Sequence, residues 1–234
     1  MLDCGYTCDN CGGELFDYPN QRVCRRCEES FLKPTKACPK CGRERVAEGI
    51  CLTCKSRGLH FTQALSPFVY KSEAAVSINR VKNGDSYLAA YFGERMAEKF
   101  LSVLGNEWDS LLIIPVPLTK KRLRERGYNQ AERLAEGVQA YLYGVGISAE
   151  TDFSILEKKR ETVAQKDVTG KEREENVKGA YHLHKRAVCK GRTVLLVDDI
   201  MTTGSTGSEC ARLILNAGAE KVFFLTATAL PEQK

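Results

Sequence analysis

The chain has 234 residues, of which 43% are hydrophobic and 28% are charged, and its formal net charge is +5 at pH 7. This composition is ordinary for a globular chain and excludes bulk disorder, collagen and low-complexity fibre. The longest apolar run, Leu111–Leu118, is too short to span a bilayer, so we expect no membrane insertion. The N-terminus has no basic stretch followed by an apolar one, which predicts a cytoplasmic protein without a signal peptide.

Cysteines are concentrated at the N-terminal end, where nine of the eleven fall within residues 1–54. Eight of these form four Cys-x-x-Cys pairs: Cys8/Cys11, Cys24/Cys27, Cys38/Cys41 and Cys51/Cys54. Each such turn directs two thiolates at one point, and two turns complete a tetrahedral zinc site. The first turn of each half is followed by a glycine, Gly12 or Gly42, so the halves form an internal repeat. We therefore predict two consecutive zinc ribbons in residues 1–57, with two structural zinc ions and Cys4 left over.

A disulfide-linked or merely thiol-rich head is the alternative explanation of these cysteines. The spacing and the expected reducing compartment favour metal over disulfides. About fifty residues also bury too little apolar surface to fold without an additional cross-link, and structural zinc provides one. Ribbons hold nucleic acid or protein in some proteins and are purely structural in others, and the sequence leaves both roles open.

Residues 58–234 alternate expected strands and helices, after a linker that we expect at 55–66. Apolar patterning predicts strands at 67–70, 111–114, 180–183, 193–197 and 222–225, and helices at 73–82, 87–104, 129–143 and 207–217. This alternation predicts an α/β domain with a mostly parallel sheet flanked by helices. Sheets of this kind bind ligands at the carboxyl ends of their strands.

The run from Val194 to Thr206 lies at one such end and passes from a buried strand through two carboxylates into a small hydroxyl-rich loop. The loop residues are Thr202, Thr203, Gly204, Ser205 and Thr206. Their backbone N–H groups, with the N-terminus of the next helix, can cradle a phosphate dianion. Asp198 and Asp199 would repel a phosphate but accept hydrogen bonds from ribose hydroxyls. The run thus predicts a site for a 5-phosphorylated ribose, the alternative being a helix capped by an acidic pair.

The same run resembles, over all thirteen positions, the signature with which type I phosphoribosyltransferases bind phosphoribosyl pyrophosphate (PRPP). A second block, Ile114–Ala131, resembles the hallmark of the ComF family of competence proteins. A third set is similar to that family's pattern between the two blocks: Thr162, Gln165, Arg173, Asn176, Gly179 and Ala180. With the cysteine-rich head, the resemblance covers nearly the whole chain. It implies a type I phosphoribosyltransferase-like domain at 58–234 behind a double zinc ribbon at 1–57.

The resemblance also implies roles for single residues. Asp198 and Asp199 are the expected catalytic residues, which hold the ribose of PRPP, and Thr202 to Thr206 are expected to hold its 5-phosphate. The segment expected to face the pyrophosphate, together with Mg²⁺, consists of Val116, Pro117, Lys120, Arg122, Arg124 and Arg126. Arg173, in the polar stretch 158–178, is expected to be brought in by a closing loop. For Lys120 and Lys121 a solvated helix face is the alternative.

Two hypotheses of function follow from the resemblance. The first is a ComF-type competence protein that handles incoming single-stranded DNA in the cytosol, with a pocket for PRPP or a related ribose phosphate and a competence helicase as a further partner. The second is an active phosphoribosyltransferase that transfers ribose 5-phosphate from PRPP to an acceptor in nucleotide metabolism. Thr202 stands where the 6-oxopurine salvage enzymes carry a carboxylate, which disfavours purine salvage. No segment resembles an acceptor pocket, and we favour the first hypothesis.

Overall fold

A parallel β-sheet forms the centre of the molecule in the computed structural model, which describes residues 6–16, 21–108, 110–161, 177–184 and 189–232. Its strands run in the order β3, β10, β9, β5, β6, and β4 also pairs with β10. Their bounds are β3 Gln63–Leu65, β4 Phe68–Val69, β5 Leu111–Pro115, β6 Ala149–Thr151, β9 Thr193–Met201 and β10 Lys221–Ala229. Every pairing in this sheet is parallel, which confirms the predicted α/β class.

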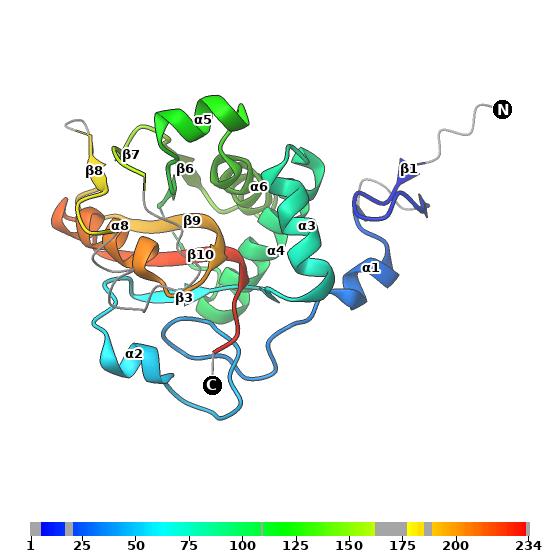
Figure 1. The fold of residues 1–234 in the computed structure, drawn as a ribbon, viewed down its shortest axis with the longest axis horizontal. Helices are drawn as coiled ribbons and strands as arrows, with labels where there is room; N and C mark the ends of the chain where they lie inside the picture. Colours follow the sequence, from blue (N-terminus) through cyan, green and yellow to red (C-terminus); the bar gives the residue numbers. More distant parts are fainter. Residues whose placement is uncertain (1–5, 17–20, 109, 162–176, 185–188, 233–234) are drawn as a thin grey trace.

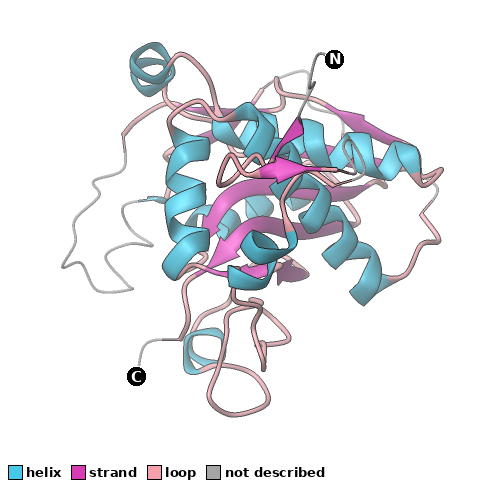
Figure 2. Ribbon diagram, turned by 90° about the vertical axis from the view of Figure 1, so that its right-hand side faces the viewer, coloured by secondary structure: helices cyan, strands magenta, loops and turns pink. Residues whose placement is uncertain are grey.

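Helices cover both faces of the sheet (Figures 1 and 2). They are α3 Ser72–Lys82, α4 Ser86–Leu104, α5 Lys120–Arg126, α6 Gln130–Gly144 and α8 Ser205–Asn216. Side chains alternate along β9, so Leu195 packs in one core with α3, α4 and α6, and Leu196 in another core with α8. Burial on both faces explains why the central strands are continuous apolar runs.

The two cysteine-rich segments pack on opposite faces of the sheet. The first contains β1 Tyr6–Thr7, β2 Glu14–Leu15 and α1 Arg25–Ser30, and its Val23 and Phe31 join the core of α3, α4 and α6. The second contains α2 Leu52–Ser56, and its Cys38 and Cys41 join the core of α8. Figure 1 shows the first segment beside α3 and the second near the C-terminus.

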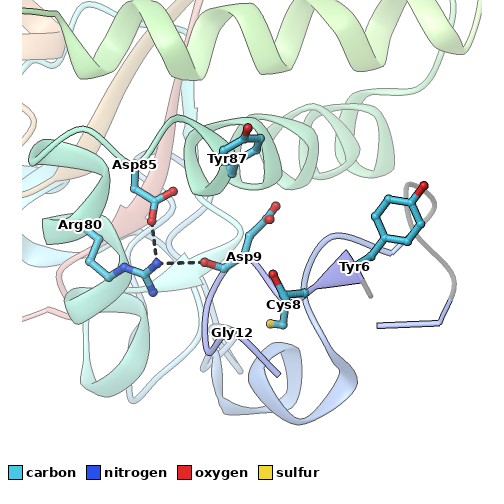
Figure 3. A pocket seen from close by; sticks show the side chains of 8 residues that line it. Tyr6, Cys8, Asp9, Gly12, Arg80, Asp85 and Tyr87 are labelled. Atoms are coloured by element: carbon cyan, nitrogen blue, oxygen red, sulfur yellow. Dashed lines mark hydrogen bonds and ion pairs between the residues drawn. The ribbon is translucent and has the colours of Figure 1, made fainter. Parts of the chain in front are cut away.

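Arg80 on α3 anchors the first segment to the body (Figure 3). Its Nη2 donates to the backbone oxygen of Asp9 at 3.0 Å and to the Asp85 carboxylate at 2.6 Å. A cavity of about 550 Å³ lies at this junction, and Tyr6 and Tyr87 are among the residues that line it. Through Arg80 the first segment is therefore attached to the helix that ends at Lys82.

Several sequence-based expectations differ from the structure. The expected linker at 55–66 is wrong, because residues 63–65 form β3 and Phe61 is fully buried. The strand expected at 67–70 is only the two-residue β4. The strand expected at 180–183 is found as β8 (Tyr181–Leu183), but it lies outside the main sheet and pairs antiparallel with β7 (Leu156–Lys158). The strand containing the acidic pair continues to Met201, because β10 pairs with it through that residue. The short strands β6 and β7 were not predicted, since they are partly exposed and lack a clear apolar period. The helix α5 corresponds to the solvated helix face that was the alternative for Lys120 and Lys121.

No helix within the described ranges is long and apolar enough to cross a membrane.

Candidate functional site

The eight paired cysteines form two clusters, as their spacing predicts. In each cluster the four Sγ atoms lie within 4.8 Å of one another; the first cluster holds Cys8, Cys11, Cys24 and Cys27, and the second Cys38, Cys41, Cys51 and Cys54. The ribbons are consecutive and not interleaved. Gly12 and Gly42 have φ angles of +72° and +69°, which explains why both knuckles use glycine.

The cysteine clusters also fit a bound metal in their hydrogen bonds. Cys8 Sγ accepts from the Cys24 N–H at 3.2 Å, and Cys38 Sγ accepts from the Cys51 N–H at 3.3 Å. Such bonds stabilise thiolates, which are the form of cysteine that binds metal. Four thiolates at these separations suit a tetrahedral ion with metal–sulfur bonds of about 2.3 Å, the geometry of structural zinc.

The acidic pair sits at the end of β9, where the sheet meets the turn into α8. Asp199 is only 7% exposed, and its N–H donates to Asp198 Oδ1 at 2.9 Å. The turn reaches α8 through Gly204, which has a φ of +82° and serves as N-cap without a side-chain hydrogen bond. The hydroxyls of Thr203 and Ser205 lie 2.9 Å apart beside it. Because glycine has no side chain that could cap the helix, the first turn of α8 can offer its backbone N–H groups to a ligand.

A cavity of about 210 Å³ brings the acidic pair together with the second sequence block. Its lining consists of Lys82, Val116, Pro117, Leu118, Arg122, Arg126, Gln130, Lys158, Tyr181, Asp198, Asp199 and Thr206. Six residues that the sequence predicts to hold ligand thus share one cavity with Thr206: Val116, Pro117, Arg122, Arg126, Asp198 and Asp199. Thr202, Thr203, Gly204 and Ser205 form the turn that leads to Thr206 and do not line this cavity.

A second, strongly basic cavity adjoins the first. It has a volume of about 490 Å³ and is lined by Lys82, Asn83, Arg122, Glu125 and Arg126. Lys82, Arg122 and Arg126 belong to both cavities. The arrangement therefore runs from the turn before α8, across the acidic pair, to a group of three cations.

Among these three cations, Lys82 is the one that pairs with the acidic residues. Its Nζ lies 3.3 Å from Asp199 Oδ2, an oxygen that is buried and accepts no hydrogen bond from the described residues. The Arg126 guanidinium donates to Gln130 Oε1 at 2.6 Å, which fixes it at the start of α6. Lys82 was missed by sequence reasoning because it ends an otherwise ordinary helix, and its partner lies far along the chain.

Three basic residues of α5 pair with neighbouring carboxylates. Lys120 lies 3.7 Å from Glu157, and Lys121 lies 3.8 Å from Glu125. Arg122, which lines both cavities, also lies 3.2 Å from Glu161. Lys120 and Arg124 are exposed and line neither cavity, in keeping with a solvated helix face for Lys120. Arg173 lies outside the described residues, as do Thr162, Gln165, Asn176 and Cys4.

Burial and neighbouring charges shift the pKa values of three residues that line the cavity. Burial, and then the neighbouring Asp199 carboxylate, raise the pKa of Asp198. Burial raises the pKa of Tyr181, so this phenol keeps its proton at neutral pH. Burial also lowers the pKa of Lys158, whose ammonium lies 5.2 Å from the Tyr181 ring centre. Lys158 and Tyr181 were not predicted as site residues, and both come from the β7–β8 hairpin that the sequence patterning did not reveal.

Comparison with known proteins agrees with this geometry. Residues 125–234 match the family model described as "Phosphoribosyl transferase domain". "Competence protein F" of Haemophilus influenzae is 29% identical over 233 residues, which cover 93% of this chain and 94% of that protein. "Competence protein ComFC" of Bacillus subtilis is 26% identical, covering 86% of this chain and 80% of that protein. "DNA utilization protein YhgH" of Salmonella typhi is also 26% identical, covering 86% and 87%.

Solved structures give more distant likenesses. A hypoxanthine phosphoribosyltransferase from Staphylococcus aureus has a TM-score of 0.39 at 10% identity and covers 62% of this chain and 76% of its own. The glutamine PRPP amidotransferase of Bacillus subtilis has a TM-score of 0.39 at 18% identity and covers 63% of this chain and 30% of its own.

The parallel sheet, the strand–turn–helix with its acidic pair and the family match define a phosphoribosyltransferase-type domain, here preceded by two Cys₄ clusters that fit a double zinc ribbon. The two competence proteins match 86% and 93% of the chain. On these similarities the chain resembles the ComF family of competence proteins.

Proposed function

We propose that this protein is a ComF-type competence protein and that it binds the ribose 5-phosphate portion of PRPP or a related ribose phosphate. In this proposal the 5-phosphate lies on the turn 202–206, the ribose hydroxyls donate to Asp198 and Asp199, and the pyrophosphate faces Lys82, Arg122 and Arg126. The observation that carries the proposal is the single cavity shared by the acidic pair and the 116–126 segment. The order of phosphate cradle, carboxylates and cations matches the order of groups in PRPP.

Mg²⁺ is proposed to bind together with PRPP, and two structural zinc ions to occupy the cysteine clusters. Carboxylate oxygens are ligands that Mg²⁺ accepts, and the Asp198 and Asp199 carboxylates both line the cavity. A magnesium ion would supply positive charge beside the pyrophosphate. The residues of the chain bind and orient the ribose, and Arg122 and Arg126 balance the remaining negative charge.

Calorimetric titration with PRPP tests this proposal. The wild type should bind PRPP more tightly with Mg²⁺ than without it. The double variant Asp198→Asn with Asp199→Asn should lose most of this affinity and still bind inorganic phosphate, because the backbone cradle remains. Glu220→Gln is the control, because Glu220 is an exposed carboxylate that pairs with Lys221 and does not line the cavity. Equal PRPP affinity in the wild type and the double variant would refute the assignment.

Binding of PRPP without turnover is the favoured function, and the transferase is the alternative. Thr202 is exposed at the turn and cannot act as a general base near neutral pH. General-base assistance typically contributes about 10²–10⁴-fold, so transfer to a free base should be slow. Rapid pyrophosphate release with a purine, a pyrimidine or glutamine would identify the active enzyme instead.

We further propose that the protein handles single-stranded DNA, as the names of its competence and DNA utilization relatives suggest. Supporting this, Lys121 and Arg124 are exposed on α5 and lie outside both cavities. If both contact phosphates, Lys121→Ala with Arg124→Ala should make the plot of log K against log salt shallower by about 1.4. The pair Arg133→Ala with Lys190→Ala, exposed elsewhere, should not change it. An unchanged slope in the α5 variant would contradict DNA contact at α5.

A further inference from the structure

Arg43 breaks the internal repeat of the two ribbons. In the first ribbon Cys11 is followed by Gly12 and Gly13, whereas in the second Cys41 is followed by Gly42 and Arg43. The two knuckles have the same backbone conformation at their first glycine. A knuckle of this kind therefore forms with glycine at the last position, and the arginine needs another explanation.

The side chain of Arg43 connects the second cysteine cluster with the phosphate turn. Arg43 is only 6% exposed, and arginine is almost never so buried unless it is paired. Its Nη2 lies 3.6 Å from Cys51 Sγ, and its Nη1 donates to the backbone oxygen of Thr202 at 3.3 Å. The planar fork of a guanidinium can reach two acceptors at once, which a lysine cannot do in the same way.

The C-terminal tail makes a second connection between the same two parts. The Glu232 carboxylate accepts from Arg45 Nε at 2.8 Å and from the Leu52 N–H at 3.0 Å, so it is clamped to the second ribbon. Two residues earlier, the Leu230 N–H donates to the backbone oxygen of Met201 at 2.8 Å. Met201 directly precedes Thr202, and Figure 1 shows the tail running beside the second ribbon.

The second ribbon also supports the turn through Phe61. Lys40 donates to the backbone oxygens of Phe61 and Thr62, the latter at 3.1 Å. The fully buried Phe61 ring lies 3.5 Å from the point where a Cβ on Gly204 would stand. The turn is thus held by the ribbon through a side chain, through the tail and through a packed ring.

The first ribbon makes its contacts elsewhere. Within the described residues, Asn10 accepts from the Ser77 hydroxyl at 2.7 Å, and Asp9 accepts from Arg80, both on α3. These hydrogen bonds of Asn10 and Asp9 reach α3 and not residues 201–206. The two ribbons therefore differ in what they support.

We infer that Arg43 is a positioning residue for the phosphate turn, and that the folded, metal-holding state of the second ribbon keeps this turn in its phosphate-binding conformation. The inference rests on the proposed function of the turn. It makes the affinity for a ribose 5-phosphate depend on the second cysteine cluster through Arg43, although no cysteine of that cluster lines the ligand cavity.

The variant Arg43→Gly tests this inference, because it gives the second knuckle the sequence of the first. Arg22→Gly is the matched control, since Arg22 lies in the first ribbon and pairs with Asp9 at 3.9 Å. Three quantities are measured on the full chain: the zinc content, the affinity for ribose 5-phosphate by calorimetry, and the hydrogen exchange of amides 201–206. The exchange measurement needs no ligand.

Arg43→Gly should keep the zinc content of the wild type, weaken ribose 5-phosphate binding by about tenfold, as expected for loss of a charge-assisted hydrogen bond, and speed exchange at 201–206. Arg22→Gly should leave affinity and exchange unchanged. If the wild type binds no ribose 5-phosphate, the proposed function fails, and exchange still decides whether Arg43 fixes the turn. Unchanged exchange in a variant that keeps its zinc overturns the inference.

If Arg43→Gly loses zinc, the variant Glu232→Gln tests the inference in its place. This variant cuts the connection through the tail and leaves the residues of the knuckle in place. Exchange at 201–206 should again become faster at wild-type zinc content, and unchanged exchange would overturn the inference.

Discussion

Lys82 is a residue of the candidate ligand site that lines both of its cavities. It pairs with Asp199 and lines the basic cavity with Arg122 and Arg126. A ligand with a pyrophosphate should gain from Lys82, whereas one with only a 5-phosphate should not, because we propose that this phosphate binds on the far side of the acidic pair.

Substituting Lys82→Met should therefore lower PRPP affinity by roughly tenfold, the size of a charge-assisted hydrogen bond, and leave the affinity for ribose 5-phosphate nearly unchanged. Calorimetry with both ligands measures the difference. Lys71→Ala, exposed just before the other end of α3, serves as the control. An equal loss for the two ligands would show that Lys82 supports the fold and not the pyrophosphate.

Asp198 gives a prediction about pH. Its pKa is raised in the folded chain by burial and by Asp199, so the unfolded chain releases this proton at lower pH. The folded state then holds more protons between the two pKa values, and stability falls as pH rises through that window. Asp198→Asn removes this cost and should raise the melting temperature at neutral pH, with the gain vanishing near about pH 4, where an ordinary aspartate takes up its proton. A variant less stable than the wild type at neutral pH would contradict the shift.

At the scale of elements, the close contact of α4 and α6 decides how the helical layer forms. A Cβ on Gly93 would stand 2.6 Å from the Leu134 backbone oxygen and 2.8 Å from Gly137 Cα. Neither atom can move without shifting a helix. The two glycines therefore permit a closer approach of the helices than any larger residue would.

The substitution Gly93→Ala should destabilise the protein by about 1–3 kcal/mol through overpacking. Gly144→Ala, at the end of α6 with nothing within 4 Å of its Cβ, should be neutral or slightly stabilising. Urea unfolding compares the two variants. A Gly93 variant as stable as the wild type would mean that the helices separate at little cost.

Long buried elements could be predicted from sequence, and short exposed ones could not. The run Leu111–Ile114 is apolar at every position because both of its faces are covered, and it forms β5. By contrast, β6 and β7 are three residues each and mostly not buried, so their positions depend on tertiary pairing. The candidate site also combines features that follow from local sequence with features that depend on tertiary contacts. The strand–turn–helix with Asp198 is local and was predicted, whereas Lys82 and Arg43 reach their partners only through the fold.

At the scale of the whole molecule, the ribbons share the cores of the body. The Phe31 ring centre of the first ribbon lies 5.3 Å from that of Phe68 and 5.6 Å from that of Phe92. Cys38 and Cys41 of the second ribbon belong to the core that contains Leu196. Residues 1–57 and 58–234 are therefore proposed as two domains that stabilise each other.

Removal of zinc should accordingly lower the melting temperature of the whole chain in one transition, because binding free energy contributes to folding. Metal analysis of protein purified without chelator should give two zinc equivalents, and restoring zinc should restore the melting temperature. Zinc near zero, or a body that unfolds at an unchanged temperature after chelation, would contradict this coupling.

A crystal structure of the protein with PRPP and Mg²⁺ tests the central claim most directly. The 5-phosphate should accept hydrogen bonds from backbone N–H groups of 202–206 at about 3 Å. The ribose hydroxyls should lie against Asp198 and Asp199, and the pyrophosphate should lie against Lys82 and Arg126. A ligand bound away from this cavity, or bound in it with the pyrophosphate on the turn before α8, would contradict the account.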